Sequence, residues 1–227
     1  MSIHQQHRQR VKEKFHKYGL QGMAPHEILE FLLFFSVPQK DTNPLAHRLI
    51  NRFGSLQGVL DAPFEYLLEV DGVGEHTATL LKLMVPLLRE YQKEPLNKIN
   101  LNCSERLGAF LTRRYFGYKT EVVSLLCMDS NFNVLSYDEV CQGDVAGADF
   151  SIRKVLELVI RNTAACVVLA HNHPGGTAVP SNLDIKATED LALALQAVGV
   201  RLLDHVIVVP GDYVSMRESA SFAHLFR

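Results

Sequence analysis

The sequence lacks a long hydrophobic run, and it lacks an excess of charge of either sign. Its apolar patches, among them FLLFF at residues 31–35, are far shorter than the roughly 20 residues that a membrane-spanning helix needs. The opening stretch, MSIHQQHRQR, has no apolar core of the kind found in a secretory signal peptide. We therefore expect a cytoplasmic protein with no membrane segment. A net charge of −2 in 227 residues gives no general attraction to nucleic acid or anionic lipid, so DNA binding requires a local site.

The sequence also lacks the paired cysteines of a disulfide framework. It has four cysteines, and no two of them are spaced as CxxC. Reduced, buried thiols are therefore predicted at Cys103, Cys127, Cys141 and Cys166. Hydrophobic residues make up 47% of the chain and charged residues 21%, as in ordinary soluble globular proteins. Internal repeats and low-complexity segments are absent from the sequence, which indicates packed domains rather than an array or a disordered chain.

The first half of the chain has helical periodicity throughout, from about residue 8 to residue 92. Apolar residues at helical spacing predict helices over 24–37, 42–53, 63–70 and 75–91. Pro25 stands near the start of the first of these helices, and Gly54 follows the second. Short helices joined by tight links predict a small all-α domain over residues 1–94.

The periodicity changes after a polar segment, QKEPLNKIN at residues 92–100, which reads as a linker. Beyond it, helical patterns at 103–116, 151–162 and 184–199 alternate with β-rich runs at 121–128, 133–141, 164–170 and 201–209. Such alternation predicts an α/β (α+β) domain with a mixed sheet over residues 102–227.

The polar stretch HNHPGGTAVPSNLD, residues 171–184, follows the apolar run VVLA. Residues two apart on a strand share one face, so His171 and His173 can direct both imidazoles to one point. Asp184 follows eleven residues after His173, near the start of the next helix, where its carboxylate can turn back to the same point. Two histidines and one carboxylate, with a fourth position for water, is the composition of a catalytic zinc site.

A purely structural interpretation of the same stretch stays open at this point. SNLD fits the S-x-x-[DE] capping box, in which Ser181 caps a helix and Asp184 bonds back to the cap. Histidines in a solvent-facing loop would need no further role. A metal-bound Asp184 would also have fewer lone pairs left for capping, so we expect the two roles to compete.

The spacing His171, His173, Ser181, Asp184 fits H-x-H-x(7)-S-x(2)-D, the signature of the JAMM (MPN+) metalloproteases. The sequence LAHNHPGG…PSNLD, with LLDHVIVV and YVS downstream, resembles that of the bacterial RadC (UPF0758) family, and the similarity covers about residues 102–227. The first half is also similar to that family, whose members carry a helix-hairpin-helix region before a JAMM/MPN-like domain. The resemblance implies a zinc-dependent peptidase or isopeptidase with a peptide or protein substrate.

The resemblance further implies a catalytic glutamate at the start of a strand after the first helix of the domain. Glu121, fifty residues before His171, stands at that place, and Glu139 is the alternative about one strand later. Zinc held by His171, His173 and Asp184 would lower the pKa of its water to about 7. Glu121 would act as general base, and the Ser181 hydroxyl would donate to the oxyanion.

The stretch LLEVDGVGEHTATLLKLM, residues 67–84, resembles a helix-hairpin-helix motif. In that motif Gly72 and Gly74 would let backbone N–H groups meet a DNA phosphate. The alternative is a tight turn that needs glycine only for its backbone angles. Residues 1–94 carry eleven Lys and Arg against eleven Asp and Glu, so we expect any DNA binding to be weak.

Three functions therefore compete. They are a zinc metallopeptidase of JAMM type, a DNA-associated repair or recombination factor that binds through the helical half, and a metal-dependent hydrolase of another amide or ester. The complete set of Glu, His, His, Ser and Asp favours an active enzyme. His205, on the apolar run 201–209, is expected to be a structural histidine; the alternative is a role beside the metal together with Asp204.

Overall fold

The structure is a computed structural model and describes residues 3–92, 96, 99–142 and 150–226. The chain divides into two compact units, Met1–Leu88 and Arg89–Arg227. Much of the predicted linker, residues 93–95 and 97–98, lies outside the described residues. No helix among the described residues is long and apolar enough to span a membrane.

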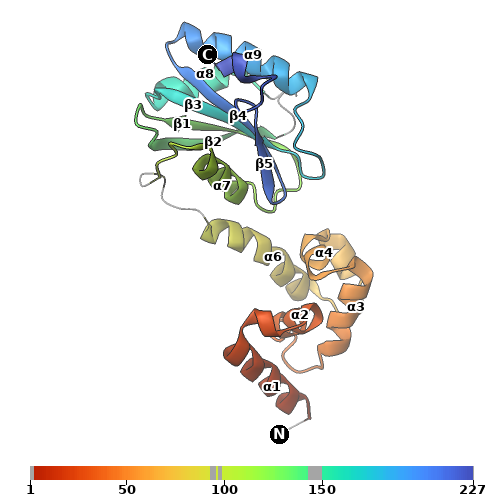
Figure 1. Ribbon diagram of the computed structural model, residues 1–227. Coiled ribbons are helices and arrows are strands. Elements are labelled where there is room, and N and C mark those ends of the chain that lie inside the picture. Colours follow the sequence, from red (N-terminus) through yellow and green to blue (C-terminus); the bar gives the residue numbers. More distant parts are fainter. Residues whose placement is uncertain (1–2, 93–95, 97–98, 143–149, 227) are drawn as a thin grey trace. The chain divides into compact units, whose positions relative to one another are not determined.

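The first unit consists of helices (Figure 1) that pack on a main apolar core, with a second, smaller cluster around Val11, Met23 and Phe34. They are α1 (Ile3–Tyr18), η1 (Leu20–Gly22), α2 (Pro25–Leu33), α3 (Asn43–Phe53), α4 (Leu56–Asp61), α5 (Phe64–Leu68) and α6 (Glu75–Tyr91). Leu29, Leu49 and Leu81, from α2, α3 and α6, are fully buried. The division between the units falls inside α6. The helical pattern of this half is confirmed, and the four predicted helices correspond to α2, α3, α5 and α6. Helices α1, η1 and α4 were not predicted as separate elements.

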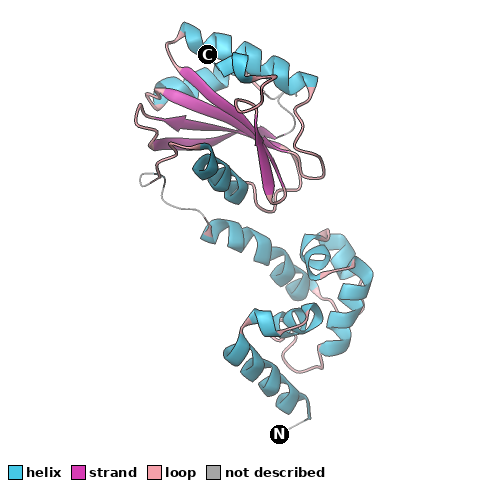
Figure 2. Cartoon of the chain, viewed as in Figure 1, coloured by secondary structure: helices cyan, strands magenta, loops and turns pink. Residues whose placement is uncertain are grey.

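The second unit is a five-stranded mixed sheet with helices on both faces (Figure 2). Its elements are α7 (Ser104–Arg114), β1 (Val122–Met128), β2 (Val134–Gln142), α8 (Ile152–Arg161), β3 (Cys166–Asn172), α9 (Asn182–Ala197), β4 (Arg201–Val209), β5 (Asp212–Ser215) and η3 (Ala223–Phe226). The strand order is β2-β1-β3-β4-β5. The β3–β4 pair is parallel, and the other pairs are antiparallel.

Each face of the sheet has its own core. Helix α7 packs Phe110 and Leu111 on one face, against Leu126 among other residues. Helices α8 and α9 cover the opposite face. Strand β3 lies in the middle, and all seven of its residues are buried, which explains why its first five, CVVLA, form a continuous apolar run. Helix α9 makes the crossover from β3 to its parallel neighbour β4, so its N-terminus lies near the carboxyl end of β3.

The cysteines do not form disulfides, as predicted, but they are not all buried. Cys127 and Cys166 lie on the central strands and are buried, whereas Cys103 is exposed and Cys141 is half-buried. The prediction of burial is wrong for Cys103 because this residue precedes the first turn of α7 rather than facing its core.

Candidate metal centre

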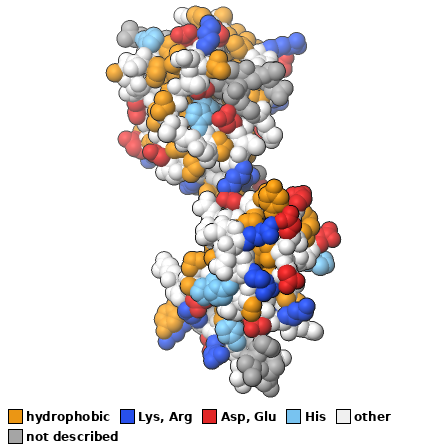
Figure 3. Space-filling model, turned by 90° about the vertical axis from the view of Figure 1, so that its right-hand side faces the viewer, with side chains coloured by type: hydrophobic (Ala, Val, Ile, Leu, Met, Phe, Trp, Pro, Cys, Tyr) orange, Lys and Arg blue, Asp and Glu red, His pale blue; other side chains and the backbone are white. Residues whose placement is uncertain are grey.

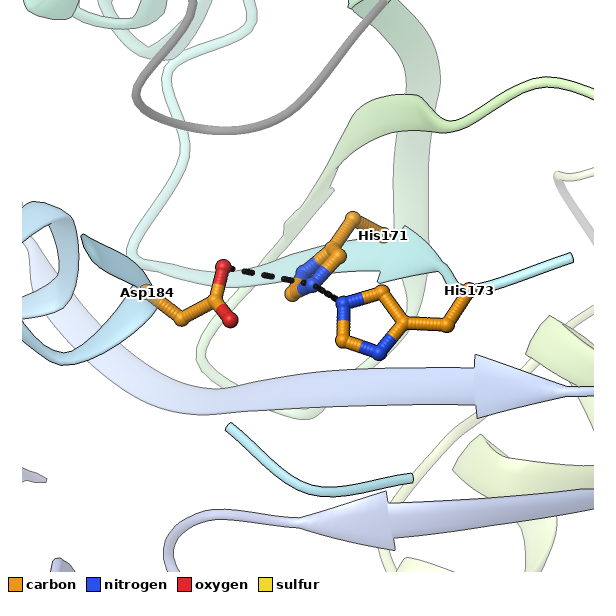
Figure 4. Close-up of side chains that lie close together, drawn as sticks. All are labelled: His171, His173 and Asp184. Carbon is orange, nitrogen blue, oxygen red and sulfur yellow. Dashed lines mark hydrogen bonds and ion pairs between the residues drawn. The ribbon is translucent and has the colours of Figure 1, made fainter. Parts of the chain in front are cut away.

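The two histidines of the HNH stretch meet at the carboxyl end of β3. The backbone N–H of His173 donates to the Val208 carbonyl at 2.8 Å, so pairing with β4 continues one residue beyond the strand. Both rings therefore keep the strand geometry, and the Nε2 atoms of His171 and His173 lie 2.9 Å apart. Asp184 reaches the same point from the first turn of α9, with its Oδ1 atom 3.3 Å from His171 Nε2 (Figure 4).

These three side chains form a compact and mostly buried group. One ligand atom from each of His171, His173 and Asp184 lies within 4.8 Å of the others. His171 and Asp184 are only 1% and 2% exposed, and His173 is half-buried. The structure thus brings together the three residues that the spacing singled out. Their role as metal ligands stays a prediction.

Asp184 divides its two oxygens between two tasks. Oδ2 accepts hydrogen bonds from the backbone N–H and the hydroxyl of Ser181, each at 2.7 Å. The N–H of Asp184 donates to Ser181 Oγ at 3.1 Å, which completes the capping box. Because Oδ1 faces His171, the capping box leaves one oxygen directed at the histidines. The structural and functional interpretations of SNLD are therefore compatible.

The outer nitrogen of each histidine has a hydrogen-bond partner. His173 Nδ1 lies 3.1 Å from the carbonyl oxygen of Thr177, and a carbonyl only accepts hydrogen bonds. His173 therefore carries its proton on Nδ1. His171 Nδ1 lies 2.9 Å from His205 Nε2, and the other ring nitrogen of His205 lies 2.6 Å from Thr188 Oγ1.

His205 is fully buried on β4. Burial, with smaller contributions from His171 and His173, holds the pKa of His205 well below its usual value. The sequence-based alternative placed His205 beside the metal together with Asp204. The carboxylate of Asp204 instead accepts from the backbone N–H of His205 at 2.8 Å and from the Ser215 hydroxyl at 2.6 Å. The ring partners of His205 are thus His171 and Thr188, and Asp204 anchors the backbone.

Glu121 immediately precedes β1 and is half-buried. Val123, two residues later, pairs with His171 and belongs to the core under α8 and α9. Since residues two apart share a face, Glu121 starts from the same face of the sheet as His171. Its carboxylate is not among the ligand atoms that converge.

The residue between the two histidines fixes the backbone around Glu121. Asn172 is 4% exposed, and its side chain bridges both flanks of Glu121. Its Oδ1 accepts from the Val122 N–H at 2.8 Å, and its Nδ2 donates to the Thr120 carbonyl at 3.0 Å. The sequence alone assigns Asn172 no role, because a motif written H-x-H treats this position as variable.

Glu139 lies on the other face of the sheet. It accepts a hydrogen bond from the Tyr118 hydroxyl, and Tyr118 packs against the core under α7. This face is opposite to the one that carries the histidines. Of the two candidate bases, only Glu121 is therefore on the face of the histidines.

The predicted hairpin joins α5 to α6 through residues 69–74. Gly72 has φ 92°, a left-handed conformation that favours glycine, whereas Gly74 has no positive φ and has open space at its Cβ position. Arg48 donates to the Asp71 carbonyl at 3.2 Å, and Arg52 is paired with Glu69. Both arginines are thus already bonded to acceptors of the hairpin.

Acidic and basic side chains also lie interspersed across the visible face of the helical unit (Figure 3). This face therefore offers no large single-sign field for a phosphate backbone. Contact of Gly72 and Gly74 with DNA stays a prediction.

Comparison with known proteins places the second unit in a described family. A family model for the RadC-like JAB domain matches residues 101–221. A UPF0758 protein of Fusobacterium nucleatum is 34% identical over 222 residues, covering 94% of this chain and 96% of the relative. A UPF0758 protein of Idiomarina loihiensis is 34% identical over 211 residues, covering 92% and 94%. A UPF0758 protein of Nitrosococcus oceani is 33% identical over 211 residues, with the same coverage.

These similarities extend over most of the chain and include both units. The resemblance inferred from the HNH stretch is confirmed, as is the predicted fold class, a mixed α+β JAB/MPN-like domain preceded by a helical region.

Proposed function

This chain belongs to the RadC (UPF0758) family, and we propose that it is a zinc-dependent hydrolase of JAMM type that cleaves peptide or isopeptide bonds. The observation that carries the proposal is the convergence of His171 Nε2, His173 Nε2 and Asp184 Oδ1.

The proton positions make this convergence unusual. Thr188 Oγ1 donates its only proton to the Asp184 carbonyl at 2.6 Å, so it accepts from His205, which in turn accepts from the Nδ1 proton of His171. With His173 also protonated on Nδ1, both Nε2 atoms carry lone pairs. Two lone pairs and a carboxylate oxygen then face one another. A cation at this point satisfies all three.

The donor set fits zinc. Two imidazole nitrogens and one carboxylate, with a fourth position left for water, are the ligands of catalytic zinc sites, and imidazole is a good ligand for this metal. Zinc held by His171, His173 and Asp184 would supply Lewis acidity, which would lower the pKa of water at the fourth position to about 7.

The other roles fall to residues of the same face. Glu121 is the general base, which takes a proton from the attacking water and delivers it to the leaving amine, an effect of about 100- to 10,000-fold. Ser181 stabilises the oxyanion by donating its hydroxyl proton, a contribution of about 2.7–4 kcal/mol. That proton now points to Asp184 Oδ2, so the hydroxyl rotates towards substrate while its oxygen still caps α9.

Metal analysis of the full chain tests the proposal. We expect near-stoichiometric zinc in the wild type, and little in His173→Ala and Asp184→Ala. His76→Ala and Asp190→Ala are the matched controls, because they remove an exposed histidine from α6 and an acidic residue from the same helix as Asp184; both should retain zinc.

Hydrolysis is measured with a fluorogenic peptide library and with a peptide joined through a lysine ε-amide. We expect the zinc-loaded wild type to cleave at least one of the two substrate types. Wild-type protein that takes up no zinc would show that protons rather than a metal satisfy the three acceptors. If the zinc-loaded protein cleaves only esters or other amides, the assignment of the metal ligands would stand and the assignment as a peptidase would be refuted.

A further inference from the structure

We infer that Thr188 and His205 are positioning residues that hold His171 in the tautomer and orientation which present its Nε2 atom to the metal site. The inference rests on the proposed function for the identity of the site. Its test reads tautomers and metal affinity rather than hydrolysis, so the two can fail separately.

The direction of the hydrogen bonds starts at Thr188, on α9. A carbonyl oxygen only accepts, so the Thr188 hydroxyl is the donor in its 2.6 Å contact with the Asp184 carbonyl. We assign the proton to this bond rather than to the longer contact with Met216 Sδ, at 3.9 Å. Thr188 Oγ1 must then accept in its other short contact, at 2.6 Å from His205 Nδ1. His205 is therefore protonated on Nδ1.

The same argument determines the tautomer of His171 from that of His205. A neutral histidine has one protonated and one unprotonated nitrogen, so His205 Nε2 presents a lone pair. That lone pair lies 2.9 Å from His171 Nδ1, which must supply the proton. His171 Nε2 is left as an acceptor directed at Asp184 and His173. We call this series of hydrogen bonds, from Thr188 through His205 to His171, the relay. It fixes His171 in the tautomer whose lone pair is on Nε2, the form that can bind a metal.

The relay also connects the two elements that carry the site. Thr188 follows Asp184 by four residues on α9, so one turn of helix presents both the carboxylate and the start of the relay. His205 on β4 joins that turn to His171 on β3. Thr188 and His205 are each 0% exposed and His171 is 1% exposed, so bulk water does not compete for these hydrogen bonds. Outer partners of ligating histidines act in this way by fixing the ring and its tautomer.

Thr188→Val tests the relay because it keeps the shape of the side chain and removes the hydroxyl. We expect the zinc affinity of the full chain to fall about 10- to 100-fold, measured by competition with a chromophoric chelator. Thr188→Ser restores the hydroxyl and should recover most of this loss. Ser215→Ala is the stability-matched control: it removes another buried hydroxyl bond, to Asp204 at 2.6 Å, without touching the ring of His205.

Nitrogen-15 NMR of the histidine rings reads the tautomers directly. In the metal-free wild type, at mildly alkaline pH where histidine side chains are neutral, we expect the Nδ1–H form at both His171 and His205. In Thr188→Val, both should shift towards a mixture of tautomers. This measurement on the wild type needs no variant to fold.

The outcomes separate the two ideas. An Nε2–H tautomer at His171 in the wild type overturns the relay, and so does a folded Thr188→Val protein with wild-type affinity and tautomers. Equal loss of zinc affinity in Ser215→Ala would assign the effect to general destabilisation and also overturn it. If the wild type binds zinc but hydrolyses nothing, the proposed function fails while the relay stands. If it binds no zinc, the tautomers alone decide.

Discussion

Replacing Asp184 by asparagine separates the two tasks of this side chain. In the wild type, Oδ2 accepts from the backbone N–H and hydroxyl of Ser181 at 2.7 Å each, and Oδ1 lies 3.3 Å from His171 Nε2. An asparagine oxygen can take the capping position, which places the amide group opposite His171. The variant thus keeps the capping box and exchanges an acceptor for a donor at the candidate metal centre.

Without metal, this exchange should not destabilise the protein. The new N–H group bonds to the His171 lone pair, and a hydrogen bond of this kind contributes about 1 kcal/mol. We therefore expect the metal-free Asp184→Asn variant to equal the metal-free wild type or to exceed it by about 1 kcal/mol in unfolding free energy. Asp184→Ala loses the capping acceptor and should fall below the wild type by about 1 kcal/mol.

In the presence of zinc, we expect the wild type to be more stable than Asp184→Asn. Ligand that binds only the folded state adds about 4 kcal/mol at 1,000 times its Kd, and the wild type should gain this amount. Asp184→Asn has lost one of three protein ligands. Its gain should be smaller by at least about 1.4 kcal/mol, which corresponds to a tenfold weaker affinity.

Urea denaturation followed by circular dichroism measures the unfolding free energies. It is carried out on the wild type and on Asp184→Asn, each in zinc buffer and in chelator, and on Asp184→Ala in chelator. Equal stabilisation of wild type and Asp184→Asn by zinc would refute the assignment of Asp184 as a ligand. A metal-free Asp184→Asn protein less stable than the metal-free wild type by 1 kcal/mol or more would refute the argument on proton positions. It would mean that Asp184 forms a favourable ion pair with a protonated His171.

Three further predictions concern residues around this site and the helical unit. Glu121→Gln should retain zinc and lose hydrolysis by about 100- to 10,000-fold, whereas Glu139→Gln, on the other face of the sheet, should keep activity in the same assay. Asn172→Ala should lower the unfolding free energy by about 1–3 kcal/mol with unchanged zinc affinity, and it should reduce hydrolysis because the backbone at Glu121 is released; wild-type activity would contradict this. DNA binding, followed by fluorescence anisotropy, should be weak and vanish by physiological salt. Gly74→Ala is the clean test of it, since Gly72→Ala is strained at φ 92°; tight, salt-resistant binding that Gly74→Ala abolishes would contradict the prediction.

The parts of the fold that the sequence predicted are those fixed by local signals. Strand β3 is buried along its whole length, and its first five residues, CVVLA, form an apolar run. Helix α9 begins at a capping box that four residues encode. The convergence of His171 and His173 follows from strand geometry alone. By contrast, β5 has four residues and α4 has six, too few to show a period.

The choice between Glu121 and Glu139 could not be made from the local sequence pattern. Both glutamates stand in β-rich runs, and nothing in either run states which side faces the histidines. The face depends on pairing: β1 pairs with β3 so that Val123 meets His171, and the register of β1 with β2 shifts between Cys127 and Met128, at a point of β2 that precedes Glu139. Such an irregularity changes the side on which later residues of β2 emerge, and a single sequence does not display it.

The capping box and the metal site illustrate a different limit, because one set of residues satisfies both. Ser181 and Asp184 would be chosen for a helix start whether or not a metal binds, so their presence cannot separate the two interpretations. What separates them is the state of His171 Nε2, and that state is set by Thr188 and His205. His205 reads as an ordinary residue of an apolar strand and Thr188 as one of an amphipathic helix. Their hydrogen bonds to the site arise only when β4 and α9 pack against β3, so the deciding information is tertiary.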